Sequence, residues 1–89
     1  MLRITIHDEK TVKRFIVEGR LSGEWVTELE RCWRKETAAQ SLQPVLVELR
    51  DVRFVSEEGL KLLQQMAQAG AELVAADLVM KALVEEIVA

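Results

Sequence analysis

The segment VLVELRDVRFVSEEGLKLL, residues 45–63, changes its hydrophobic period at one turn, and this change constrains the fold more than any other feature. Residues 45–49 are almost continuously apolar and β-branched, which is typical of a central strand covered by helices on at least one face. After the turn, apolar residues recur at helical spacing, which predicts a helix over roughly 57–69. Its predicted inner face consists of Gly59, Leu60, Leu63, Met66 and Ala67.

The N-terminal part of the chain predicts a hairpin followed by a helix. Residues 2–7 alternate apolar and polar side chains, and residues 11–21 return as a second strand. Ser22 is a suitable N-cap for a helix that runs to about Ala39. The apolar stripe of this helix is Trp25, Val26, Leu29, Cys32 and Trp33.

The C-terminal part predicts one more strand over 71–76 and a last helix that Asp77 caps. The inner stripe of that helix is predicted to be Val79, Met80, Leu83, Val84 and Ile87. The resulting order, ββαβαβα, predicts a single α/β domain over residues 1–89. A strand–helix–strand series of this kind favours a mixed, mostly parallel sheet with helices packed against it.

Charge and composition exclude several classes of partner. The net charge is −3 and no run of Lys or Arg exceeds two residues, which argues against nucleic acid and anionic membranes as main partners. Charges interrupt every apolar stretch before it reaches the ~20 residues of a membrane span, so no membrane insertion is expected. A single cysteine and the lack of a signal-peptide core predict a reduced, cytoplasmic protein.

The residue types that carry most enzyme chemistry are sparse. The one histidine, His7, falls on the polar face of the first strand, and the one cysteine, Cys32, falls on an apolar helix stripe. Neither has the neighbours of a catalytic or metal site, so a solvated histidine and a small buried hydrophobe are the favoured interpretations. The glycines do not form a phosphate-binding spacing. We therefore expect no enzymatic activity and no cofactor.

The turn at residues 56–60 has a physical explanation of its own. Ser56 is a good N-cap, and Glu57 and Glu58 place negative charge at the positive end of the helix. Gly59 is less easily explained, because glycine inside a helix costs about 1 kcal/mol relative to alanine. Its presence predicts that a neighbouring strand or a partner protein approaches the backbone closely.

The element order, EGRLSGEW at 18–25, the segment 45–63 and GAELVAA at 70–76 together resemble a STAS domain over essentially the whole chain. The resemblance implies the fold of bacterial anti-sigma-factor antagonists. The family hallmark is an apolar strand, then Asp-Ser-(Ser/Thr)-Gly-Leu, then a helix. In its regulatory members, a partner anti-sigma kinase of the histidine-kinase-like ATPase fold phosphorylates the Ser or Thr before the glycine. Phosphorylation releases that partner and so regulates transcription through the sigma factor.

Carried onto this chain, the hallmark implies a partner-binding turn at residues 56–60. Gly59 and Leu60 keep the Gly-Leu pair. Glu58 occupies the phosphoacceptor position, Glu57 the preceding Ser position and Ser56 the Asp position.

A second part of the partner-facing rim is implied at Ser22 and Gly23, where the family often has Gly-x-Leu-Asp. Glu58 accepts no phosphate, and three interpretations stay open. It imitates a phosphorylated state permanently, or it forms a constant recognition element with Glu57 for a basic residue of the partner, or the pair is only a charged helix start. Ser56 is a further candidate phosphosite.

The resemblance implies a regulatory protein–protein interaction module that binds an anti-sigma factor or kinase without phospho-switching at Glu58. An alternative keeps the fold and changes the partner, because small STAS-like domains also serve as accessory subunits of ABC-type lipid transporters and dock on the ATPase subunit. The sequence does not predict the oligomeric state.

Overall fold

The computed structural model describes residues 1–38 and 43–88. The elements in these ranges confirm the predicted order ββαβαβα. They are β1 (Leu2–Asp8), β2 (Lys13–Leu21), α1 (Glu24–Thr37), β3 (Val45–Val55), α2 (Glu57–Gln68), β4 (Glu72–Ala75) and α3 (Leu78–Val88). The predicted helix end at Ala39 lies outside the described residues.

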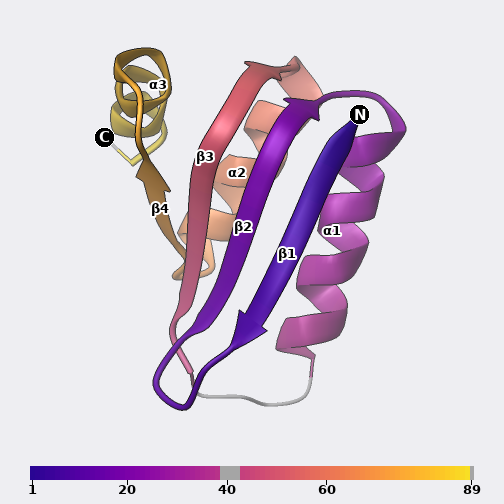
Figure 1. Ribbon diagram of the computed structural model, residues 1–89, viewed down its shortest axis with the longest axis vertical. Coiled ribbons are helices and arrows are strands. Elements are labelled where there is room, and N and C mark those ends of the chain that lie inside the picture. The colour runs from indigo at the N-terminus through magenta and orange to yellow at the C-terminus, as the bar shows by residue number, and fades with distance from the viewer. Residues whose placement is uncertain (39–42, 89) are drawn as a thin grey trace.

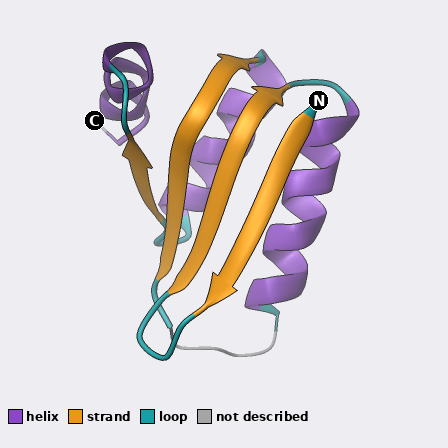
Figure 2. Cartoon of the chain, viewed as in Figure 1, coloured by secondary structure: helices purple, strands orange, loops and turns teal. Residues whose placement is uncertain are grey.

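The strands form one mixed sheet in the order β1-β2-β3-β4 (Figures 1 and 2). β1 is antiparallel to β2, as the predicted hairpin requires, whereas the β2–β3 and β3–β4 pairs are parallel. β3 is longer than the apolar run 45–49 that predicted it. It continues to Val55, with Val52 in the core and Val55 packed against it, while Arg53 and Phe54 between them are exposed.

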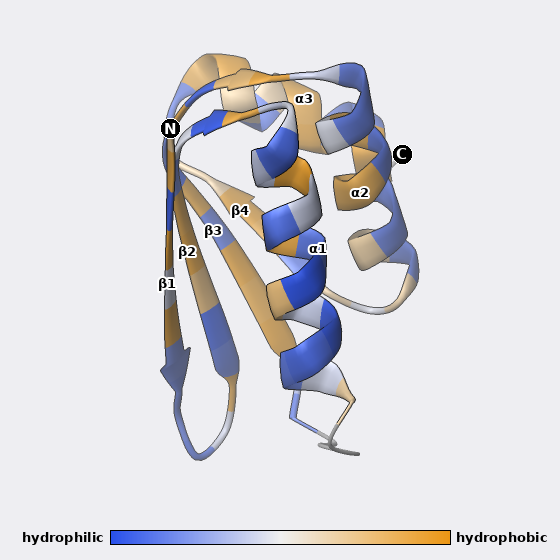
Figure 3. Ribbon diagram, turned by 90° about the vertical axis from the view of Figure 1, so that its right-hand side faces the viewer, coloured by the Kyte–Doolittle hydropathy of each residue, from blue (hydrophilic) through white to orange (hydrophobic). Residues whose placement is uncertain are grey.

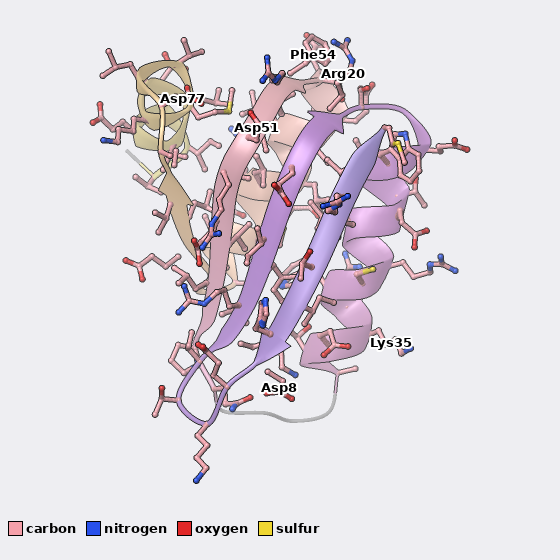
Figure 4. The ribbon with its side chains drawn as sticks, viewed as in Figure 1. Asp8, Arg20, Lys35, Asp51, Phe54 and Asp77 are labelled. Atoms are coloured by element: carbon pink, nitrogen blue, oxygen red, sulfur yellow. The ribbon has the colours of Figure 1, made fainter. Side chains whose placement is uncertain are left out.

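The helices α1 and α2 lie side by side on one face of the sheet, which Figure 3 shows edge-on. α3 lies beyond the end of β4 and contacts β4 and α2 (Figure 1). The core fills the space between sheet and helices. Its fully buried side chains are Phe15, Val17, Leu21, Leu29, Val47, Leu49, Leu63 and Met66. The opposite face of the sheet carries no helix among the described residues and is lined mainly by polar and charged side chains (Figure 4).

The prediction that Ser22 caps α1 was wrong. The N-cap is Gly23, with φ 57° and no side-chain hydrogen bond to the helix. Ser22 contributes its backbone carbonyl instead, which accepts a hydrogen bond from the Trp25 N–H at 3.1 Å. A positive φ at the cap residue suits glycine, so the chain turns from β2 into α1 through Gly23.

Two inner faces also differ from their predictions. In α2, Leu62 is buried and Leu60 is only half-buried, so the buried stripe runs through Gly59, Leu62, Leu63 and Met66. In α3, Val79 is 73% exposed and Met80 is the buried residue. The reason in α3 is geometric: the helix is apolar on several sides, but the sheet beneath it ends at β4.

Candidate functional site

Two turns meet at one end of the sheet. Leu21 and Val55, the last residues of β2 and β3, are register partners, so Ser22 and Ser56 follow neighbouring parallel strands at the same edge. The carboxyl ends of parallel strands are where α/β proteins commonly build binding sites. We call the exposed and half-buried residues of these two turns the rim: Ser22, Gly23, Ser56, Glu57 and Glu58.

Ser56 fixes the geometry of the second turn. Its hydroxyl oxygen accepts a hydrogen bond from the Gly59 N–H at 3.1 Å, which confirms the predicted N-cap. Its own N–H donates to the Leu21 carbonyl at 2.9 Å and extends the contact between β2 and β3 past the end of the sheet. The Ser56 hydroxyl therefore acts as an acceptor that holds the start of α2 in place.

Glu57 and Glu58 project from the first turn of α2 and are exposed. Neither forms a salt bridge in the part of the chain that the structure describes. Their negative charge is compensated only by the helix N-terminus and by solvent. This arrangement leaves two adjacent carboxylates available to a cationic partner.

Gly59 belongs to the core rather than to the exposed surface. A Cβ at this position would lie 2.9 Å from the Leu21 carbonyl oxygen and 3.1 Å from Cγ1 of Val55. The close approach inferred from the sequence is thus made by strands β2 and β3. Glycine lets the first turn of α2 sit directly on the ends of these strands, and Leu60 beside it remains half-buried.

Sequence reasoning missed an aromatic residue beside the rim. Phe54 is 41% exposed, and the guanidinium of Arg20 lies 4.6 Å from its ring centroid (Figure 4). The pair arises because Arg20 and Phe54 are register partners after a shift in the β2–β3 pairing. Strict alternation along β3 does not predict that shift. The one hint in the sequence is an aromatic residue, Phe54, placed between Arg53 and the turn that begins at Ser56.

A further electrostatic contact lies away from the rim, on the open face of the sheet. The carboxylate of Glu48 accepts hydrogen bonds from the guanidinium groups of Arg14 and Arg50. The hydrogen bond from Arg14, more than that from Arg50, lowers the pKa of Glu48 below its ordinary value. This cluster ties β2 to β3.

Several other features bear on ligands. Among residues 1–38 and 43–88, no group of three or more His, Cys, Asp or Glu side chains is arranged to hold a metal ion. His7 is exposed, and Cys32 is half-buried on α1 beside the core. No helix within the described ranges combines the length and the apolar character needed to cross a membrane.

No family model and no curated protein matches the chain. In three dimensions it is similar to the crystal structure of an uncharacterized protein of the DUF3478 family, with a SpoIIAA-like fold, from Shewanella loihica PV-4. The TM-score is 0.61 at 13% sequence identity, and the match covers 91% of this chain and 72% of that chain. The chain therefore has a SpoIIAA-like fold, the STAS-like architecture that the sequence resemblance implies.

Proposed function

We propose that this protein is a regulatory interaction module, similar to anti-sigma-factor antagonists, that binds an anti-sigma factor or kinase of the histidine-kinase-like ATPase fold through the rim. The proposal rests on one observation. The two turns that the resemblance assigns to partner binding, residues 22–23 and 56–60, lie at the same edge of the sheet, with two carboxylates that form no salt bridge among the described residues.

The chemistry of the rim favours a basic protein surface as its partner. Glu57 and Glu58 offer adjacent negative charges, and Phe54, two residues before Ser56, offers exposed apolar area. Interfaces commonly combine a few desolvated aromatic residues with complementary charges that steer association. In this proposal, Glu58 is a constant recognition element, and Ser56 positions the turn rather than accepting phosphate.

A second partner fits the same surface. An accessory role on the ATPase subunit of an ABC-type lipid transporter needs no phosphoacceptor, which agrees with glutamate at position 58, and we take the rim as its docking surface as well. The two candidate functions differ in the protein that binds the rim and not in the rim itself.

Affinity purification from the native cells, followed by mass spectrometry, tests both. Three baits are compared: the wild-type protein, the double variant Glu57→Lys/Glu58→Lys, and a matched control, Glu85→Lys/Glu86→Lys. Both acid pairs are exposed and helical, but only the first belongs to the rim. We expect the wild-type and control baits to recover one ATPase-fold protein that the rim variant loses.

The identity of that protein separates the candidates. Recovery of an anti-sigma factor or kinase supports the antagonist function, and recovery of transporter subunits supports the alternative. A partner that survives Glu57→Lys/Glu58→Lys contradicts the assignment of the rim. The affinity of purified Glu58→Ser for that protein then distinguishes the interpretations of Glu58. An affinity equal to that of the wild type would mean that Glu58 is only a charge at the helix start.

A further inference from the structure

The outer edge of β3 is only partly paired. β4 pairs with β3 from Leu46 to Leu49 and then ends at Ala75, whereas β3 continues to Val55. From Arg50 onward, β3 has a partner strand only on the β2 side within the described residues. An unpaired strand edge presents backbone N–H and C=O groups that a further strand can satisfy.

A shallow groove follows this free edge. It has two parts: a cavity of about 270 Å³ over the last paired residues of β3 and β4, and a cavity of about 280 Å³ between the unpaired part of β3 and the residues that begin α3. The first is lined by Leu49 and Val74, and the second by Val52, Val79 and Met80. Leu49, Val52 and Met80 are buried in the core, so the groove combines a free backbone edge with the exposed apolar side chains of Val74 and Val79, as in proteins that bind an extended peptide by adding it to a sheet.

Two of the three charged side chains that line the second cavity are acidic: Asp51 and Asp77 are carboxylates, and Arg53 carries the positive charge. Asp51 of β3 and Asp77, just before α3, both line the second cavity, on its two sides (Figure 4). The Asp51 carboxylate contacts Arg53 at 3.4 Å, but both side chains are well exposed, so this ion pair contributes little. A cationic side chain placed between Asp51 and Asp77 would be attracted to both carboxylates.

From these observations we propose that the groove binds an extended segment of another protein as an added strand beside Arg50–Val55. Side chains alternate along a strand, so the segment has an apolar residue toward Val79 and a Lys or Arg toward Asp51 and Asp77. This surface uses no rim residue, and the inference stands independently of the proposed function.

Hydrogen exchange measured by NMR, with synthetic peptides as probes, tests the proposal. The first peptide alternates valine and lysine, the second alternates valine and glutamate, and the third is the valine–lysine peptide with alternate backbone nitrogens methylated. In the free protein, the amides of Arg50–Val55 that are not bonded to β2 exchange rapidly. The valine–lysine peptide slows them by about tenfold or more at saturation, and the other two peptides do not.

Two exposed neighbours on α3 provide matched variants. Val79→Lys places a positive charge in the groove and lowers the affinity for the valine–lysine peptide about fivefold or more. Leu78→Lys adds the same charge at a position that is 83% exposed and does not line either cavity, so affinity changes by less than about twofold.

Several results would overturn the proposal. They are slow exchange of these amides in the dilute free protein, no binding of the valine–lysine peptide, equal binding of either control peptide, and equal loss of affinity in the two variants. Protection that rises with protein concentration in the absence of peptide also overturns it, because a second copy of the chain would then occupy the edge.

Discussion

The helices α2 and α3 begin in the same way and pack very differently. In each, a side-chain oxygen of the residue just before the helix accepts a hydrogen bond from the N–H three residues later: Ser56 to Gly59 at 3.1 Å and Asp77 to Met80 at 2.9 Å. Yet α2 buries Gly59, Leu62, Leu63 and Met66, whereas α3 buries only Met80 among its described residues.

The difference shows that burial here depends on position over the sheet more than on hydrophobicity. α3 is the more apolar of the two helices, but it lies past the end of β4, so Leu78 and Val79 have no strand beneath them. α2 packs on β3 and β4, and Gly59 sets its first turn against the ends of β2 and β3. The rim therefore rests on the well-packed helix, and the groove along β3 borders the loosely packed one.

The largest expected effect comes from matched truncations in the two helices. Leu63 is fully buried, so Leu63→Ala should lower the free energy of unfolding by about 2–5 kcal/mol through lost apolar burial and a cavity. Leu78 is 83% exposed, and Leu78→Ala should change the free energy of unfolding by less than about 0.5 kcal/mol. Urea denaturation measures both. Similar losses in the two variants would contradict the proposed difference in packing.

Gly59→Ala should destabilise the protein even though alanine favours a helix. The added Cβ would lie 2.9 Å from a backbone oxygen of β2, so the helix must shift off the strand ends. Overpacking typically costs about 1–3 kcal/mol and outweighs the gain in propensity of about 1 kcal/mol. Gln64→Ala, at an exposed position of the same helix, serves as the control and should be nearly neutral. A more stable Gly59→Ala protein would show that the contact is not tight.

Removing either N-cap should weaken its own helix to a similar extent, but the two variants should differ in the stability of the whole protein. Ser56→Ala removes the hydroxyl acceptor from α2 and should lower the global unfolding free energy by about 1 kcal/mol. Asp77→Ala removes the carboxylate acceptor from α3, which packs less tightly and can open by itself. Its main effect should be faster amide exchange within residues 78–88. Equal loss of global stability in both variants would mean that α3 unfolds together with the rest.

The smallest expected effect is a pH dependence at the sheet. Because hydrogen bonds from Arg14 and Arg50 lower the pKa of Glu48, the folded state holds that proton less tightly than the unfolded state. The stabilisation is therefore complete above the unfolded pKa and is lost as pH falls through the folded value. NMR titration should give a pKa for Glu48 below 4.5, and Arg14→Gln should raise it. An unchanged pKa in that variant would contradict the assigned cause.

Much of the fold follows from local patterns in the sequence. The alternation in residues 2–7, the change of period at Ser56 and the helical stripes on either side of it predict the element order, because most elements show their own periodicity. The length of β3 and the exposure of Phe54 were not predictable in this way. Both depend on register shifts between β2 and β3, which arise from pairing between strands and not from either strand alone.

The site was predictable to a similar degree. The resemblance placed Ser22 and Ser56 at one edge, and the paired ends of β2 and β3 bring them there. The role of Ser22 was missed because a serine before a helix predicts a side-chain cap, while the turn here uses its backbone carbonyl. The free edge of β3 has no sequence signal, since it depends on where β4 ends relative to its neighbour.

Site-specific photo-crosslinking in the native cells tests the central claim, that the rim is the partner-binding surface, most directly. A benzophenone amino acid is placed at position 58 in the rim, or at position 86 on α3 as the matched exposed control. We predict one dominant crosslinked protein from position 58, with an ATPase fold, and none from position 86. Crosslinking from position 86 to the same protein with none from position 58 would contradict the claim.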